Sequence, residues 1–157
     1  MLNELDQELT RRSEYFVRYA DDLIIFCPSK AAANQALKHI APCIEEKLFL
    51  SLNKEKTVIV HADKAKFLGY GFFRSYDGYR LRVHERSLEK MRLKLSNLAM
   101  RAVDAEGFKN LKQYITSWTA QYKSAALERF LTDCSGWMGK ELQAIFIEAW
   151  NNFNNNY

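Results

Sequence analysis

The stretch Tyr19-Ala20-Asp21-Asp22 lies between the apolar runs Tyr15–Val17 and Leu23–Cys27, and it decides the fold of the first part of the chain. Both runs are rich in alternating and β-branched residues, which favours two paired strands with the acids at or beside a tight connection. Carboxylates held close together raise one another's pKa unless a cation lies between them. Oxygen ligands of this kind suit a divalent ion, typically Mg²⁺. The pair therefore predicts the chemistry of nucleotidyl transfer, in which metal ions bind the attacking and leaving oxygens.

A plainer interpretation of the acid pair is a solvated turn, because Asp side chains commonly hydrogen-bond to nearby backbone in turns. The flanking sequence favours the metal site. The segment Phe16-Val17-Arg18-Tyr19-Ala20-Asp21-Asp22-Leu23-Ile24-Ile25-Phe26 closely resembles the signature hairpin of reverse transcriptases, specifically that of group II intron-encoded proteins.

Two further segments resemble the next blocks of the same family, in the same order. Leu52-Asn53-Lys54-Glu55-Lys56-Thr57 is similar to the block after the hairpin, and Phe67-Leu68-Gly69-Tyr70-Gly71-Phe72 to the block that forms the primer-grip hairpin. The remainder, with Trp118, Tyr122, Gly136 and Trp137 in helical surroundings, resembles the thumb or maturase domain. Three ordered blocks at family-like separations carry the resemblance over nearly the whole chain.

The resemblance implies roles for individual residues. Asp21 matches the principal metal ligand, Asp22 has a weaker or indirect role, and Tyr19 packs beneath the primer end or supports the turn. Lys56 is a candidate cation near the departing pyrophosphate, with solvation of a turn as the equal alternative. The residues that match the primer- and template-binding block are Phe67, Leu68, Gly69, Tyr70 and Gly71.

The resemblance also implies partners and a cofactor. They are intron or template RNA and an RNA/DNA duplex, with deoxynucleotides and Mg²⁺ in the complete enzyme. That chemistry needs another carboxylate from an earlier palm strand, and Asp6, the only upstream Asp, lies in an amphipathic helix. Because Mg²⁺ demands near-octahedral geometry, two ligands hold it weakly. We expect a C-terminal portion of the enzyme without fingers, which alone does not polymerise; whether the chain is an enzyme stays open.

The composition describes a globular protein. Hydrophobic residues make up 48% and aromatic residues 13%, with six Gly and two Pro among 157 residues, which argues against disorder. No apolar run approaches the length of a membrane span, and the acidic, amphipathic N-terminus differs from a secretory signal. Three widely spaced cysteines (Cys27, Cys43 and Cys134) fit neither a disulfide framework nor a metal site, so we expect reduced, buried thiols and a cytoplasmic location.

The order of patterns predicts an α+β fold, with part of a polymerase palm over residues 1–84 and a helical thumb or maturase domain over residues 85–157. In the first part we expect helices over 2–12 and 30–48, the second capped by Ser29 and interrupted at Pro42. The hairpin of 15–27 lies between them, and strands over 67–73 and 79–83 flank an Asp-Gly turn. From Glu85 onward the pattern is helical, with a frayed tail from Asn151 to Asn156.

The segment of residues 87–102 predicts a helix with one apolar and one cationic face. Leu88, Met91, Leu95, Leu98 and Ala102 share the apolar face. The opposite face gathers Arg86, Lys90, Lys94 and Arg101, which predicts contact with RNA phosphates or a merely solvated surface. The net charge of +4 arises in the second half of the chain, because residues 1–73 carry ten basic and ten acidic side chains.

The later helices supply mainly core residues. Leu111, Ile115, Trp118 and Tyr122 form one stripe, and aromatic residues at helical spacing are more often core than base-stacking, so Trp118 and Trp137 are interpreted as structural. A further seam follows at Met138, Leu142, Ile145 and Ala149. Two other functions stay open: a non-catalytic module that binds structured RNA and assists splicing, and an inactive truncated remnant.

Overall fold

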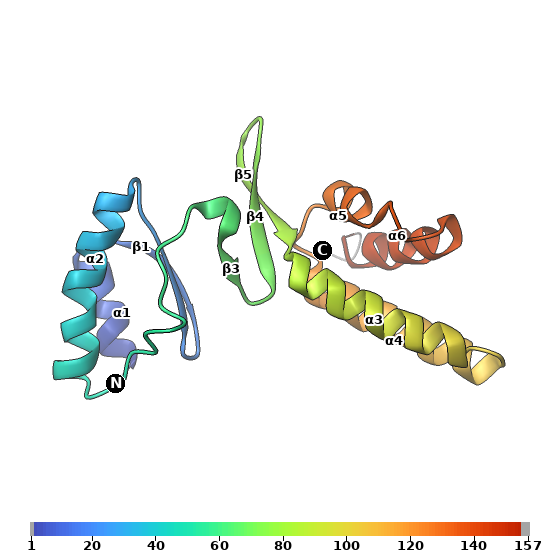
Figure 1. Cartoon of the computed structure of the whole chain (residues 1–157), viewed down its shortest axis with the longest axis horizontal. Helices are drawn as coiled ribbons and strands as arrows, with labels where there is room; N and C mark the ends of the chain where they lie inside the picture. The colour runs from blue at the N-terminus through green and yellow to red at the C-terminus, as the bar shows by residue number, and fades with distance from the viewer. Residues whose placement is uncertain (1, 155–157) are drawn as a thin grey trace. The chain divides into compact units, whose positions relative to one another are not determined.

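The computed structural model describes residues 2–154, and it has the predicted α+β fold. The chain forms two compact units, Met1–His61 and Ala62–Tyr157. Figure 1 labels most of the helices and strands of both units. The predicted domain division, at residues 84 and 85, concerns the assignment of palm and thumb and stays a prediction.

The first unit is a hairpin covered by two helices. Helix α1 spans Leu2–Arg11, strands β1 and β2 span Tyr15–Tyr19 and Asp22–Phe26, and helix α2 spans Lys30–Pro42. A π-helical turn, η1, continues from α2 over Cys43–Lys47. The two strands are antiparallel, with Tyr15 opposite Phe26 and Tyr19 opposite Asp22. The hairpin and both helices therefore form as the sequence predicts.

Alternation along the hairpin decides which face is buried. Phe16, Leu23 and Ile25 pack against a core of Leu5 and Leu9 from α1, with Ala36, Ile40 and Leu48. The other face carries Tyr15, Val17 and Tyr19, whose side chains are 79%, 49% and 66% exposed. Side chains in a strand point alternately to opposite faces, so a single register fixes both the core and the exposed row.

The ends of α2 have local chemical causes. The Ser29 Oγ accepts a hydrogen bond from the Ala32 N–H, which satisfies one of the free donors at the start of the helix. At Pro42 the α-helical pattern gives way to η1, because proline has no N–H to continue the ladder. Both features agree with the predicted cap and interruption.

The second unit begins with a three-stranded antiparallel sheet in the order β3-β4-β5. A short 3₁₀ turn, η2, spans Ala62–Lys64, and the strands span Lys66–Phe67, Tyr70–Ser75 and Gly78–Val83. The predicted strand over residues 67–73 is confirmed for residues 70–73, which pair with β5, and is wrong at its start. Leu68 and Gly69 have φ angles of +50° and +86°, so they turn the chain back and pair Phe67 with Tyr70.

Four helices complete the second unit: α3 over Glu85–Arg101, α4 over Ala105–Tyr122, α5 over Leu127–Cys134 and α6 over Lys140–Asn154. Strand β5 is hydrogen-bonded to the residue that precedes α5, because the Ala126 N–H donates a 2.9 Å hydrogen bond to the Leu81 carbonyl. The predicted frayed tail is wrong for residues 151–154, which belong to α6; its last two residues, 155 and 156, lie outside the described chain.

An aromatic cluster fills the helical core. Trp118 contacts Phe130 and Phe146 at ring-centroid distances of 5.4 and 5.7 Å, and Phe130 stacks on Trp150 at 5.2 Å. Trp118 is therefore structural, as predicted. Trp137 is partly buried against the same core, with the Arg92 guanidinium 5.5 Å from its ring. The predicted apolar stripes of α3 and α4 face this core, except that Ala102 lies just past the end of α3, as its C-cap.

Among residues 2–154, none of the helices combines the length and the apolar character needed to cross a membrane.

Candidate functional site

The acid pair lies at the turn of the β1–β2 hairpin, as predicted. Ala20 and Asp21 form the two-residue connection between Tyr19 and Asp22, which face each other across the strands. Ala20 has a φ of +50°, a left-handed conformation that residues other than Gly, Asn and Asp seldom adopt. Asp21 and Asp22 are both exposed, and neither side chain has a hydrogen bond or ion pair within the described part of the chain.

Arg18 connects this turn to helix α1. Its Nε and Nη2 donate to the Asp6 carboxylate at 2.7 and 2.5 Å, and its Nη1 donates to the Ala20 carbonyl at 2.9 Å. The hydrogen bond from Arg18 lowers the Asp6 pKa, and the Arg18 charge lowers it further. The guanidinium is therefore fixed beside the acid pair while it is engaged by a third carboxylate.

The carboxylate oxygens at the turn are the kind of ligand that a divalent cation binds. Carboxylate oxygens are hard ligands of the type that Mg²⁺ prefers, and both acids are open to solvent. Residues 2–154 contain no group of three or more His, Cys, Asp or Glu side chains placed to hold one ion. Asp21 and Asp22 thus offer at most part of a coordination shell, and the assignment of both as metal ligands stays a prediction.

Lys56 belongs to the same unit but to a different element. It lies in an irregular turn, where its N–H donates to the Asn53 carbonyl and to Asn53 Oδ1. This local bonding agrees with the predicted turn. No interaction links Lys56 to Asp21 or Asp22 within residues 2–154, so its role at a departing pyrophosphate stays a prediction.

In the second unit, a groove of about 420 Å³ lies at the Leu68–Gly69 turn. The turn, helix α3 and helix α4 form its walls. The groove brings together residues that were predicted separately. Leu68 and Gly69 belong to the block that resembles the primer-grip hairpin, and Lys90 belongs to the cationic face of α3. The other lining residues are Lys66, Ser87, Met91, Tyr114, Trp118, Gln121 and Tyr122.

Close backbone packing holds the turn at this position. The Gly69 carbonyl accepts hydrogen bonds from the His84 N–H at 3.0 Å and from the Ser87 hydroxyl at 3.1 Å. A Cβ atom at Gly69 would lie 2.4 Å from the Tyr122 hydroxyl oxygen, closer than real contacts allow. Glycine is therefore required here both by its left-handed φ and by the space that the groove wall leaves.

The groove combines aromatic side chains with two cations. Trp118 and Tyr122 have centroids 4.6 Å apart, and they join the groove to the aromatic core. Lys66 and Lys90 are exposed at its edge. Burial raises the pKa of the Tyr114 hydroxyl, which keeps it a neutral hydrogen-bonding group at physiological pH. The groove therefore presents two cations beside a wall of largely buried aromatic side chains.

His84 caps α3 beside the same turn. Its Nδ1 accepts a hydrogen bond from the Arg86 N–H at 3.2 Å, which requires an unprotonated Nδ1. Desolvation lowers the His84 pKa, and the positive charge of Lys66 lowers it further. The position of His84 as a helix cap was not predicted from the sequence.

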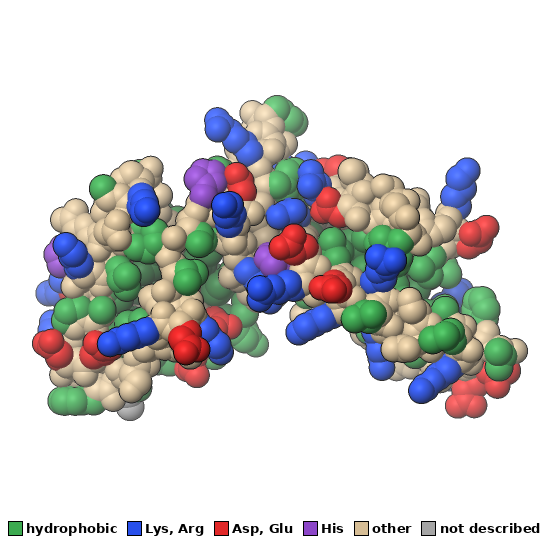
Figure 2. Space-filling view, in the orientation of Figure 1, with side chains coloured by type: hydrophobic (Ala, Val, Ile, Leu, Met, Phe, Trp, Pro, Cys, Tyr) green, Lys and Arg blue, Asp and Glu red, His purple; other side chains and the backbone are tan. Residues whose placement is uncertain are grey.

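The remaining predicted primer-binding residues and the other cations of α3 lie outside the lining of the groove. Phe67 and Tyr70 flank the turn, and Gly71 is buried beside Arg82 on the neighbouring strand. Arg86, Lys94 and Arg101 are exposed on α3 but do not line the groove. Figure 2 shows Lys and Arg side chains, with a few acids among them, over the region of α3 and α4. Their assignment as ligands of nucleic acid stays a prediction.

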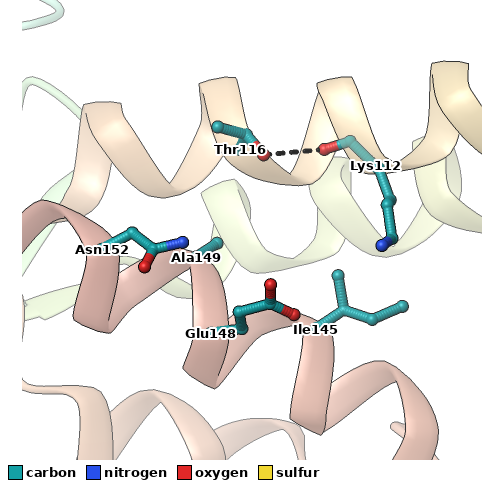
Figure 3. Close-up of a pocket in the computed structure, with 6 residues that line it drawn as sticks. All are labelled: Lys112, Thr116, Ile145, Glu148, Ala149 and Asn152. Carbon is teal, nitrogen blue, oxygen red and sulfur yellow. Dashed lines mark hydrogen bonds between the residues drawn. The ribbon is translucent and has the colours of Figure 1, made fainter.

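A second hollow, of about 70 Å³, lies between α4 and α6 (Figure 3). Lys112 extends from α4, and Glu148 and Asn152 extend from α6. Its volume is far below the 300 Å³ or more of typical ligand pockets. We interpret it as an imperfection of helix packing.

Sequence reasoning missed most of the groove wall. Lys66, Ser87, Tyr114 and Gln121 come from three different elements, and no spacing in the sequence indicates that they meet. The pairing of Asp6 with Arg18 was also missed. Its only signal was that Asp6 is the sole Asp before the hairpin and that Arg18 stands within the family-like block.

Comparison with known proteins gives one family. The family model described as Reverse transcriptase (RNA-dependent DNA polymerase) matches residues 1–72, slightly less than half of the chain. This part of the chain is thus similar to reverse transcriptases, which act on nucleic acid and nucleotides and generally use divalent metal ions. The match says nothing specific to group II introns or maturases. No curated protein matches the chain.

Proposed function

We propose that the chain is part of a group II intron-type reverse transcriptase/maturase, and that it contributes the acid pair and a primer-strand groove. One observation carries the proposal for the groove: Leu68, Gly69 and Lys90 line the same concave surface. The family match over residues 1–72 supports a polymerase of the RNA-directed kind and includes the acid pair.

At the hairpin turn, Asp21 and Asp22 would hold the divalent ion. When bound, the ion stabilises the charge that develops on the oxygens of nucleotidyl transfer. The residues of this chain present two carboxylates at a fixed turn, open to solvent and close to each other in sequence. Tyr19, whose side chain is 66% exposed, supplies an aromatic surface next to them for the primer end.

In the groove, Lys66 and Lys90 are the phosphate contacts. Lysine acts as a compact point charge toward phosphate, and both side chains are exposed at the groove edge. The Gly69 backbone lies in the groove lining, where glycine is the residue that fits beside Tyr122 and Ser87. Tyr114 and Gln121 add neutral polar groups beside the lysines. A sugar-phosphate backbone supplies the negative charge that these lysines would bind.

Binding of an RNA/DNA hybrid duplex tests the groove. We expect the double variant Lys66→Gln/Lys90→Gln to weaken binding at low salt, and to reduce the slope of log affinity against log salt by about one to two, because each lost phosphate contact removes about one unit. Lys140→Gln is the matched control, because Lys140 is exposed at the start of α6 and does not line the groove. Equal salt slopes for all three proteins would contradict the proposed groove.

Primer extension tests the acid pair. We expect no robust extension by this chain with Mg²⁺ or Mn²⁺, because two carboxylates do not complete the coordination shell. Within a complete enzyme that supplies a further carboxylate, Asp21→Asn should abolish extension, and Asp22→Asn should reduce it less. Robust extension by this chain alone would contradict the proposal that another part of the enzyme must supply a further carboxylate.

The exposed cationic side of α3 favours a second candidate, a non-catalytic module for structured RNA. Arg86, Lys94 and Arg101 lie outside the groove, so their roles are separable from that of Lys66. Structured RNA is recognised largely through shape and phosphate contacts. If Arg86→Gln/Lys94→Gln/Arg101→Gln weakens binding of folded intron RNA while Lys66→Gln does not, the splicing module is favoured. Absence of binding to either nucleic acid would favour an inactive remnant.

A further inference from the structure

We propose that Asp6 is a positioning residue, which holds the Arg18 guanidinium away from Asp21 and so keeps the acid pair available for a cation. The inference rests on the proposed metal-binding role of Asp21 and Asp22. It concerns residues of the first unit only, and it assigns a purpose to an upstream carboxylate that is not itself a metal ligand.

The geometry of Arg18 is the first support. Its Nε and Nη2 both donate to Asp6, at 2.7 and 2.5 Å, and this two-pronged contact is the strongest type of arginine–carboxylate hydrogen bonding. The two side chains are 20% and 30% exposed, so solvent screens the pair only partly. The orientation of the guanidinium is therefore set by helix α1.

The position of the third nitrogen is the second support. Arg18 Nη1 donates to the Ala20 carbonyl at 2.9 Å, and the Ala20 carbonyl carbon is bonded directly to the Asp21 nitrogen. The guanidinium thus lies one peptide unit from Asp21 and makes no ion pair with it. The hydrogen bond to Asp6 raises the Arg18 pKa most, and the Asp21 charge also raises it. The hydrogen bond from Nη1 supports the Ala20 conformation, whose φ of +50° shapes the turn that presents the acids.

Competition for Arg18 follows from these contacts. With Asp6 ionised, a nearby carboxylate neutralises the guanidinium. If the Asp6 charge is removed, Asp21 remains as an acid whose charge acts on Arg18. An arginine that pairs with Asp21 occupies the oxygens that a cation would use. Asp6 therefore acts on the acid pair through Arg18, across the interface between helix α1 and the hairpin.

Titration of the full 157-residue chain with Mn²⁺, monitored by paramagnetic broadening of the Asp21 and Asp22 amide signals, tests the inference. We expect Asp6→Asn to require roughly threefold to fivefold more Mn²⁺ for the same broadening, the size of an exposed ion-pair effect. Glu8→Gln is the matched control, because it removes a carboxylate from the same helix, where Glu8 pairs with Arg11 and Arg12. It should leave the broadening unchanged.

The double variant Asp6→Asn/Arg18→Gln separates charge competition from damage to the fold. We expect it to regain the Mn²⁺ response of the unsubstituted chain, because the competing cation is gone. A double variant as weak as Asp6→Asn would overturn the inference, and so would an Asp6→Asn variant that matches Glu8→Gln. Near-identical far-ultraviolet circular dichroism of the variants shows that the comparison is made on folded protein.

A measurement without metal keeps the inference apart from the proposed function. In Asp6→Asn, nuclear Overhauser contacts from the Arg18 side chain should move from α1 to Asp21. If they do not move, the inference fails whatever the metal result. If they move but the unsubstituted chain shows no Mn²⁺ broadening at Asp21 and Asp22, the competition for Arg18 stands and the proposed metal site fails.

Discussion

The hydroxyl of Tyr70 donates a 2.6 Å hydrogen bond to the backbone carbonyl of Gln121, fifty-one positions later in the chain. Tyr70 follows the Leu68–Gly69 turn, and Gln121 lies in the last turn of α4. The Tyr70 and Tyr122 rings also meet, with centroids 5.3 Å apart. One wall of the candidate groove is thereby fixed to the other, so its width depends on packing within the second unit.

Substitution of Gly69 tests this close packing. We expect Gly69→Ala to destabilise the second unit by about 1–3 kcal/mol, because it combines a left-handed backbone with a steric clash. All three tryptophans, at positions 118, 137 and 150, lie in this unit, so their fluorescence during urea unfolding reports on it alone.

Gly136→Ala is the control for Gly69→Ala. A Cβ atom at Gly136 meets no atom within 4 Å, so its unfolding midpoint should change little. Equal midpoints for the two variants would show that the Gly69 turn is not packed against Tyr122.

The aromatic core gives a second prediction. Phe146 is fully buried and contacts both Trp118 and Phe130, so Phe146→Ala should lower the free energy of unfolding by about 3–5 kcal/mol. Leu93→Ala, at a side chain 62% exposed on α3, should change it by less than about 0.5 kcal/mol. A small effect at Phe146 would contradict the placement of α6 against α4.

The His84 cap predicts a pH dependence of stability. Because the fold lowers the His84 pKa below its ordinary value of 6.5, the neutral form is favoured in the folded protein. Its contribution to stability is complete above pH 6.5 and is lost as the pH falls through the lower, folded-state pKa. Tryptophan-detected urea midpoints measured from pH 7.5 downward should therefore decrease.

His84→Asn isolates this contribution, since Asn keeps a cap acceptor that does not titrate. The variant should lose less stability than the unsubstituted chain over the same pH range. Parallel pH profiles would contradict the role of His84 as the titrating cap.

The cysteines should differ in reactivity. Burial raises the pKa of Cys134 to about 12, and the neighbouring Asp133 charge raises it further, so the thiolate is scarce at pH 8. Cys27 is only partly buried, and we expect a disulfide reagent to label it before Cys134, as peptide mass spectrometry would show. All three thiols should react in guanidinium chloride. Early labelling of Cys134 in native protein would contradict its burial in the core.

Much of the fold was predictable because the local signals agree with one another. Ser29 marks the start of α2, the apolar stripes of α3 and α4 face the core, and alternation around Asp21 and Asp22 predicts the hairpin. The break at residues 68 and 69 was not predictable by periodicity, because Leu is uncommon at a positive φ and Phe67–Phe73 alternates like one strand. Packing against Tyr122 and Ser87 outweighs the local preference there.

The two candidate sites also differ in how far local sequence signals predict them. The acid pair was predictable because its two members are adjacent in sequence and share one turn. The groove required tertiary structure, because Lys66 and Gln121 meet only through the turn of one hairpin and the end of a distant helix. The contact of Asp6 with Arg18 likewise joins a helix to a strand, and charge alone does not select that partner among the basic residues.

The hydrogen bond from the Ala126 N–H to the Leu81 carbonyl limits where the chain can be divided into pieces that fold separately. A cut placed between β5 and α3 would separate that donor from its acceptor, and also Tyr70 from Gln121. The resulting pieces would expose apolar surface that each now covers for the other. Swapping the helical half between related proteins should therefore succeed only when the β3–β5 sheet travels with it.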